Sequence, residues 1–299
     1  MQQRRAEPVE QRRFQRACYL ANVSMIDEQL GRIMDALGAR GLLDDTVIVF
    51  ASDHGDSLGD HGHSQKWNMY EETVRVPAIC WMGPGARAGI AAREGIAAPA
   101  ASLPSDARAR VAGLVSLFDL GPTVLELAGI SPPADMEAVS LFPIVASRLI
   151  GPTRDAPRER RPSGAADPRA TGGPDASSSR LIERADEAVS VSDATWDVPS
   201  SRPAFVNADG TRRYVFAEHG RDNILAETDV MTMVRDDRWK LVTFSGASGG
   251  QLFDLHRDPD ERVNLWDDPE TAAERRRLTD VLHEWYRESV YLTRARRRR

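Results

Sequence analysis

Residues 46–66 read TVIVFASDHGDSLGDHGHSQK, and this stretch decides the fold class. Its first part, residues 46–51, is a continuous run of β-branched and apolar side chains. Such runs are typical of a strand that is buried on both faces, as in a parallel sheet. The run ends at residue 51 and is followed by a polar, glycine-rich segment that carries Asp and His. The stretch therefore predicts a buried strand that leads directly into a functional loop.

A helical pattern precedes this strand. Apolar residues recur three or four positions apart between residues 14 and 37, and Gly38 and Gly41 are stop signals. A helix that leads into a buried strand is typical of α/β proteins. We therefore expect residues 14–150 to form a mostly parallel mixed sheet flanked by helices. The apolar positions are Leu20, Val23, Ile26, Leu30, Ile33 and Leu37.

The rest of the chain divides into a linker and a second unit. Gly, Pro, Ser and Ala fill 18 of the 30 positions in residues 151–180, and the large apolar residues are absent there. Such a segment cannot bury enough apolar surface to offset its ordering entropy, so we expect residues 151–203 to be a disordered insertion or linker. Short strand patterns and a closing helix follow, which predicts a small α+β subdomain with an antiparallel sheet over residues 204–299.

Composition narrows the class of protein. The 299 residues include 39 Lys and Arg against 45 Asp and Glu, and the net charge of −6 argues against a general nucleic-acid binder. The sequence shows no apolar run of membrane-spanning length, and its Arg-rich start lacks the apolar stretch of a signal peptide. Cys18 and Cys80 cannot form a disulfide framework, and their apolar neighbours suggest core positions. We expect a cytoplasmic protein that has no membrane or nucleic-acid partner and that can form a homo-oligomer.

Three residues of the polar segment can carry chemistry. Ligands in open α/β sheets bind beyond the carboxyl ends of the strands, which is where Asp53 and His54 stand. Their side chains offer an oxygen and an imidazole nitrogen to a divalent cation. Lys66 offers a compact positive charge to an anionic substrate oxygen. An ordinary loop has a similar composition, however, and two ligands make an incomplete coordination shell.

The same residues carry a family resemblance. Ser52-Asp53-His54-Gly55, Leu58-Gly59-Asp60-His61-Gly62, Lys66, Tyr70-Glu71-Glu72 and Val76-Pro77 resemble the metal-and-lysine block of the sulfatase family, within the alkaline-phosphatase-like superfamily. Further matches lie on both sides of this block, in the family's order. They are residues 19–37, residues 115–129 with Asp119 and Pro122, Val139-Ser140-Leu141, residues 234–241 and residues 252–265.

The resemblance implies hydrolysis of a small-molecule sulfate ester at one divalent cation, most often Ca²⁺, with Mn²⁺ possible. Asp53 and His54 correspond to metal ligands, and Lys66 corresponds to the catalytic residue that binds the sulfate group. His61 lies in a recurrent turn of the family and is expected to be structural.

One departure from the family concerns the nucleophile. Sulfatases use formylglycine, made from the first residue of Cys/Ser-x-Pro-x-Arg, and neither Cys18 nor Cys80 begins that motif. The family's early Asp pair is also missing, so the chain resembles the C-terminal portion of a sulfatase, with an incomplete alkaline-phosphatase-like sheet. Three hypotheses stay open. They are a sulfatase of the arylsulfatase or choline-sulfatase type, a phosphodiesterase or phosphonate monoester hydrolase of the same superfamily, and a non-catalytic truncated remnant.

Overall fold

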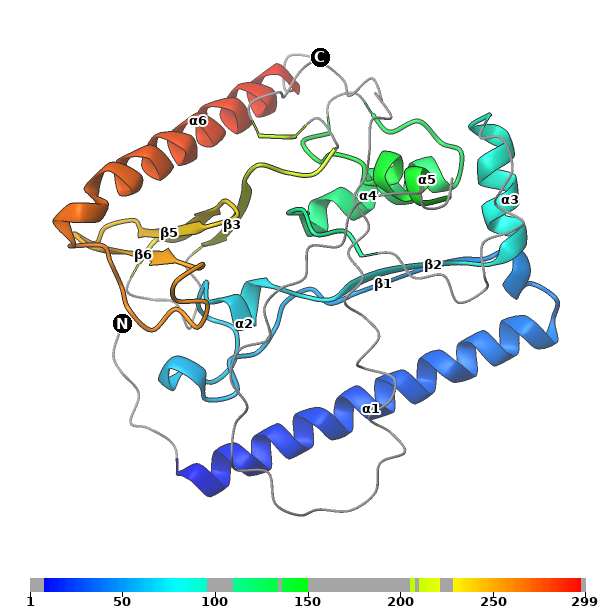
Figure 1. Cartoon of the computed structure of the whole chain (residues 1–299), viewed down its shortest axis with the longest axis horizontal. Helices are drawn as coiled ribbons and strands as arrows, with labels where there is room; N and C mark the ends of the chain where they lie inside the picture. Colours follow the sequence, from blue (N-terminus) through cyan, green and yellow to red (C-terminus); the bar gives the residue numbers. More distant parts are fainter. Residues whose placement is uncertain are drawn as a thin grey trace, which may run out of the picture.

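The computed structural model describes residues 8–95, 110–133, 136–149, 205–207, 210–220 and 228–296. Its elements form a two-stranded sheet with a few short helices, a four-stranded sheet, and two long helices (Figure 1). The expected linker, residues 151–203, lies outside the described residues.

The decisive apolar run forms strand β1 (Val47–Ala51), as expected, but its pairing differs from the expectation. β1 pairs antiparallel with β2 (Ala78–Met82), and no parallel pair occurs within the ranges that the structure describes. The reason is that a parallel partner requires a crossover that returns the chain to the first end of the strand. Residues 52–77 instead stay at the carboxyl end of β1, so β2 runs back along it. The expectation of a mostly parallel sheet is therefore not confirmed.

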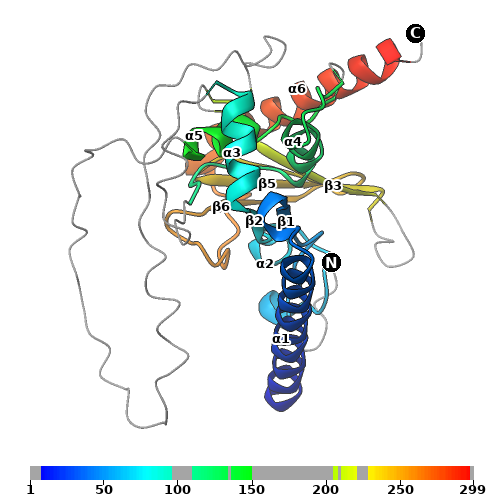
Figure 2. The same cartoon turned by 90° about the vertical axis from the view of Figure 1, so that its right-hand side faces the viewer.

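Helix α1 (Val9–Ala39) realises the predicted helical pattern and ends where the glycines are. Gly41 has a φ of +67°, and the Leu42 amide donates to the Leu37 carbonyl at 2.9 Å, which closes the last turn. No residue of α1 is buried, and the helix projects from the rest of the molecule (Figure 2). Cys18 on α1 and Cys80 on β2 are both exposed, so the expectation that they are core residues was wrong.

Three helices cover one side of the β1–β2 ribbon. They are α3 (Pro84–Arg93), α4 (Leu120–Leu127) and α5 (Phe142–Leu149). A small core joins them to β2: Met82, Ile90, Phe142 and Ala146 are buried, and Leu127 of α4 packs against them. Helix α3 thus packs into this core through Ile90.

The C-terminal unit is an antiparallel sheet of four strands in sequence order, as predicted. The strands are β3 (Val215–Gly220), β4 (Val230–Arg235), β5 (Trp239–Phe244) and β6 (Gly250–Asp254). Helix α6 (Ala272–Arg296) lies along one face of this sheet (Figure 1). The other face packs on the segment around helix α2 (Glu71–Val74).

Alternation along the strands assigns the two faces of this sheet. Val234, Leu241 and Leu252 pack with Leu278 and Leu282 of α6. Met231, Met233 and Val242 point the opposite way and pack on Met69. The second face therefore packs on the segment that follows Lys66.

Among the helices of the described residues, none has both the length and the apolar character needed to span a membrane.

Candidate active site

The polar loop predicted from the sequence starts where β1 ends and folds back on itself. Its backbone hydrogen bonds join the Ser57 amide to the Gln65 carbonyl at 3.0 Å and the Gly59 amide to the His63 carbonyl at 2.9 Å. The Gly55 amide donates to the Thr73 carbonyl at 2.8 Å. A Cβ on Gly55 would lie 1.8 Å from the Glu72 carbonyl oxygen, so only glycine permits this approach. These contacts hold residues 53–66 as one defined loop.

Backbone strain concentrates in this loop. Four non-glycine residues in the described ranges have a positive φ, and three of them are Leu58, His61 and Gln65. Left-handed backbone is uncommon for residues with a Cβ and tends to cluster at functional sites. The fourth, Glu261, also contacts the segment that follows the loop.

The structure brings Asp53, His54 and Lys66 together. The His54 Nδ1 atom lies 2.7 Å from the Gly55 carbonyl oxygen, so Nδ1 carries the proton and donates it to that oxygen. The Nε2 atom is then free to accept a hydrogen bond from Lys66 Nζ, at 2.5 Å. Asp53 Oδ2 lies 3.5 Å from the same Nε2. A carboxylate, an imidazole and an ammonium group thus meet at the carboxyl end of β1.

These three groups face solvent. The Asp53 side chain is 84% exposed and that of His54 is 36% exposed, and Lys66 is also exposed. An exposed ammonium beside a strand end can meet an anion from solution without a burial cost. The arrangement can therefore bind a small anionic group.

Asp53 and His54 suit a divalent cation chemically, but they are not a complete site. No group of three or more His, Cys, Asp or Glu side chains with metal-binding geometry occurs in the part of the chain that the structure describes. The Nε2 lone pair of His54 is also engaged by Lys66. A cation would need further ligands from outside these residues, and Lys66 would have to release His54.

His61 is positioned by packing, in line with the structural reading of its turn. Its ring stacks on Tyr70 with centroids 3.8 Å apart, and its Nε2 lies 3.6 Å from Glu72 Oε1. Burial raises the pKa of the Tyr70 hydroxyl, which therefore stays protonated at neutral pH. The ring pair connects the loop to the segment that follows it.

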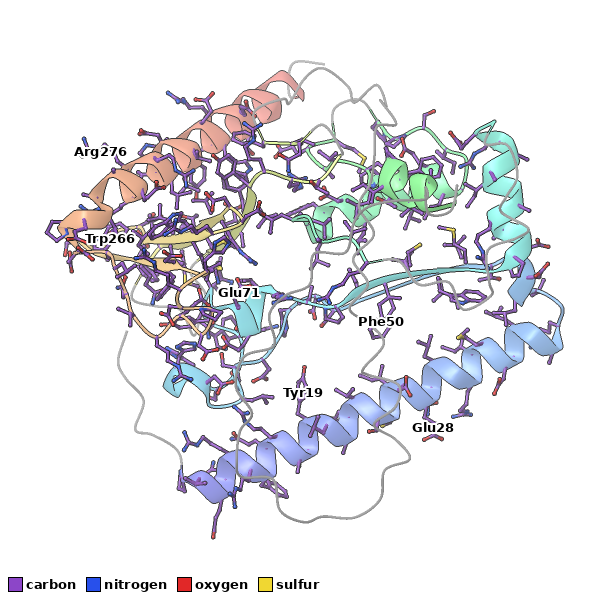
Figure 3. The ribbon with its side chains drawn as sticks, viewed as in Figure 1. Tyr19, Glu28, Phe50, Glu71, Trp266 and Arg276 are labelled. Atoms are coloured by element: carbon purple, nitrogen blue, oxygen red, sulfur yellow. The ribbon has the colours of Figure 1, made fainter. Side chains whose placement is uncertain are left out.

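Sequence reasoning gave no role to several residues that contact this segment. They are Trp67, Tyr70 and Glu71 of the segment itself, and Lys240 and Glu261 of the C-terminal unit. Figure 3 shows Glu71 on α2, beside the C-terminal sheet. The side chain of Lys240 is fully buried although it ends in a charged ammonium group. The available signal was a lysine at an inward position of the alternating pattern 239–244.

Comparisons with known proteins identify relatives of this chain. Residues 2–130 match the family model of the sulfatases. Arylsulfatase K of Gallus gallus is 30% identical over 252 residues, which are 84% of this chain and 33% of that protein. Choline-sulfatase of Rhizobium meliloti (strain 1021) is 28% identical over 267 residues, which are 89% of this chain and 36% of that protein.

A solved structure shares the fold. The phosphonate monoester hydrolase of Agrobacterium radiobacter superposes with a TM-score of 0.58 at 23% identity, over 91% of this chain and 41% of that one. The match of residues 2–130 to the sulfatase family model confirms the resemblance to sulfatases for that part of the chain. The chain spans about a third of the length of the two curated relatives.

Proposed function

We propose that this chain provides the sulfate-binding part of the active site of a metal-dependent sulfuric ester hydrolase. The observation that carries the proposal is the junction of Lys66 Nζ with His54 Nε2 at 2.5 Å, beside Asp53 and at the end of β1. The sulfatase match over residues 2–130 includes all three residues and supports the same chemistry.

Lys66 is the anion-binding group in this proposal. Its ammonium donates hydrogen bonds to the sulfate oxygens and stabilises the negative charge that develops on the leaving side. His54 holds the ammonium in place through Nε2, and the Gly55 carbonyl fixes the ring that does so. The two contacts keep Lys66 aimed at the strand end before substrate arrives.

A divalent cation, Ca²⁺ or Mn²⁺, would be held in part by Asp53 and, once Lys66 releases its Nε2 atom, by His54. It would supply Lewis-acid stabilisation of the ester oxygens. Because the described residues do not complete its coordination, we assign it no step. The chain also has no Cys/Ser-x-Pro-x-Arg motif, so the formylglycine nucleophile is not part of what this chain contributes.

Binding of inorganic sulfate to the 299-residue chain tests the proposal, measured by calorimetry with and without Ca²⁺. Lys66→Ala should weaken sulfate binding by roughly tenfold to a hundredfold, because a charge-assisted hydrogen bond is worth about 1.5–3 kcal/mol. Lys66→Arg should retain part of the affinity. Arg262→Ala is the matched control, since it removes one cation that is 76% exposed and pairs with Asp260. Equal affinity in Lys66→Ala and the parent chain would refute the assignment.

A phosphonate monoester hydrolase is the second candidate, and the superposition on the Agrobacterium radiobacter enzyme favours it. Turnover of phenyl sulfate and of a phenyl phosphonate ester separates the two, measured on a form of the protein that also contains the Cys/Ser-x-Pro-x-Arg nucleophile motif. A higher rate on the sulfate supports the first proposal, and a higher rate on the phosphonate supports the second. Sulfate binding without turnover of either ester by that nucleophile-containing form supports a non-catalytic module. We further propose a cytoplasmic location and a small-molecule ester as substrate.

A further inference from the structure

We infer that the C-terminal sheet is a platform that positions Lys66, and that Lys240 is its central positioning residue. The inference deepens the proposed function, on which it rests for the role of Lys66. It concerns the second face of the sheet, which packs on residues 67–74, directly after Lys66 in the chain.

Lys240 is the centre of this contact. Its side chain is fully buried, and Nζ donates to the Met69 carbonyl at 3.0 Å. The same nitrogen lies 2.7 Å from Glu71 Oε1 and 2.7 Å from Glu261 Oε1. A buried ammonium is costly unless carboxylates and carbonyls surround it, as they do here. One side chain of β5 thus holds the backbone and a side chain of the segment that follows Lys66.

The two carboxylates are held in turn. Arg235 Nη1 on β4 lies 2.8 Å from Glu71 Oε2, so each oxygen of that carboxylate meets a different cation. The Glu71 amide donates to Glu261 Oε2 at 2.7 Å. Two positive and two negative side chains therefore balance in the cluster. Burial raises the pKa of the Glu261 carboxyl, and the charge of Lys240 opposes that rise.

The two outer strands contact the same segment. Gln251 Nε2 on β6 donates to the Tyr70 hydroxyl at 3.1 Å. His219 on β3 packs edge-on against Trp67 with ring centroids 5.2 Å apart. Every strand of the sheet therefore reaches residues 67–71.

The segment held by the sheet also contacts the loop that carries Lys66 and His54. Trp67 adjoins Lys66 in the chain, and its ring lies 5.8 Å from the Lys66 ammonium. Tyr70 stacks on His61 inside the loop, and Thr73 receives the Gly55 amide, next to His54. Since residues 67–73 are fixed from the sheet side, the loop ends that carry Lys66 and His54 are fixed with them. The sheet touches no proposed substrate group, so its role is positioning.

Hydrogen exchange on the 299-residue chain tests this inference without any need for activity. In Lys240→Met, the loop amides Gly55, Ser57 and Gly59 should exchange about tenfold faster, because the segment that accepts the Gly55 amide and anchors the end of the loop is released. The amides of the β4–β5 ladder should stay within about twofold of the parent. Arg238→Met is the matched control, because it removes a cation from the same sheet whose buried partner, Asp254, contacts neither the loop nor residues 67–71 in any bond described here.

The outcomes separate cleanly. Faster exchange confined to the loop in Lys240→Met supports the inference, and equal acceleration of loop and ladder overturns it, as does no change. If Lys240→Met does not fold, Gln251→Leu, which removes only the bond to Tyr70, gives the same readout with a smaller effect. Sulfate affinity measured in parallel keeps the two proposals distinct. Loop-confined exchange with no sulfate binding in the parent would leave the platform intact and refute the proposed function.

Discussion

At the scale of single residues, a buried carboxylate is stabilised by an arginine. Asp254 on β6 is almost fully buried, and Arg238 binds it through two hydrogen bonds of 3.1 and 2.6 Å. The hydrogen bonds from Arg238 hold the pKa of the Asp254 carboxyl below its ordinary value. The pair therefore stabilises the fold only while Asp254 is ionised.

A pH prediction follows for this pair. Because the folded pKa of Asp254 is depressed, its stabilisation is fully present above the unfolded pKa of about 3.9 and is lost as pH falls through the folded value. We expect Arg238→Met to lower the free energy of unfolding at neutral pH. Below about pH 4, in the acid limb of the curve of stability against pH, the variant should lose less stability than the parent. Urea midpoints between pH 6 and pH 2.5 measure this. Parallel acid limbs in the parent and Arg238→Met would contradict the assignment.

The close approach at Gly55 gives a second prediction. Gly55→Ala would drive a methyl group into the Glu72 carbonyl, and we expect it to cost about 1–3 kcal/mol of unfolding free energy. Gly89→Ala is the control, since nothing lies within 4 Å of a Cβ at that position of α3. That change should stabilise the chain by about 0.5–1 kcal/mol. Thermal or urea unfolding of both variants decides the matter, and similar effects would refute the steric argument.

At the scale of elements, the two long helices behave in opposite ways. Helix α6 buries Leu278 and Leu282 against the sheet, and Trp285 stacks on Phe216 at 4.7 Å. Helix α1 buries nothing, and Ile33 is 56% exposed. Figure 3 shows Tyr19 of α1 and Phe50 of β1 pointing toward each other across the space that separates the two elements. Of the two long helices, only α6 is therefore stabilised by a hydrophobic core.

Alanine substitutions in the two helices should reveal this difference in burial. Leu278→Ala should cost about 2–5 kcal/mol, because it removes a fully buried side chain and leaves a cavity. Ile33→Ala should change the unfolding free energy by less than about 0.5 kcal/mol, since the side chain is exposed. Chemical unfolding followed by tryptophan fluorescence measures both. A large loss in Ile33→Ala would show that α1 is covered in solution.

At the scale of the whole molecule, one buried ion pair joins segments far apart in the chain. Asp119 is fully buried next to α4, and Arg212 binds both its oxygens, at 2.7 and 2.5 Å. The amides of Ser116 and Val139 also donate to this carboxylate, each at 2.9 Å. The cluster links residues 116–139 to the chain that enters β3.

Removal of this link should be costly. Arg212→Met leaves the Asp119 carboxylate buried and without its cation, and we expect a loss of about 3–5 kcal/mol. Arg262→Ala, which breaks an exposed pair with Asp260, should cost less than about 1 kcal/mol. Urea titration of the two variants compares them directly. A small loss in Arg212→Met would show that the two segments do not depend on this pair.

The sequence alone determined much of the local structure and identified the candidate site residues. The apolar run at 46–51, the helical spacing before it and the alternating strands after residue 214 each specify an element from neighbouring side chains. Asp53, His54 and Lys66 were identified from one loop, and the structure brings them together. Their roles as metal ligands and sulfate-binding residue stay predictions.

Only the tertiary structure decided the strand pairing and the support of the site. A run of apolar residues predicts burial, but the path of residues 52–77 set the antiparallel pairing of β1 with β2. Lys240 and Glu71 are 169 positions apart in the sequence, so no local pattern joins them, yet folding places their charges 2.7 Å apart. Local patterns fix elements because near neighbours dictate backbone conformation, whereas buried charge pairs form only when distant segments exclude water from the same place.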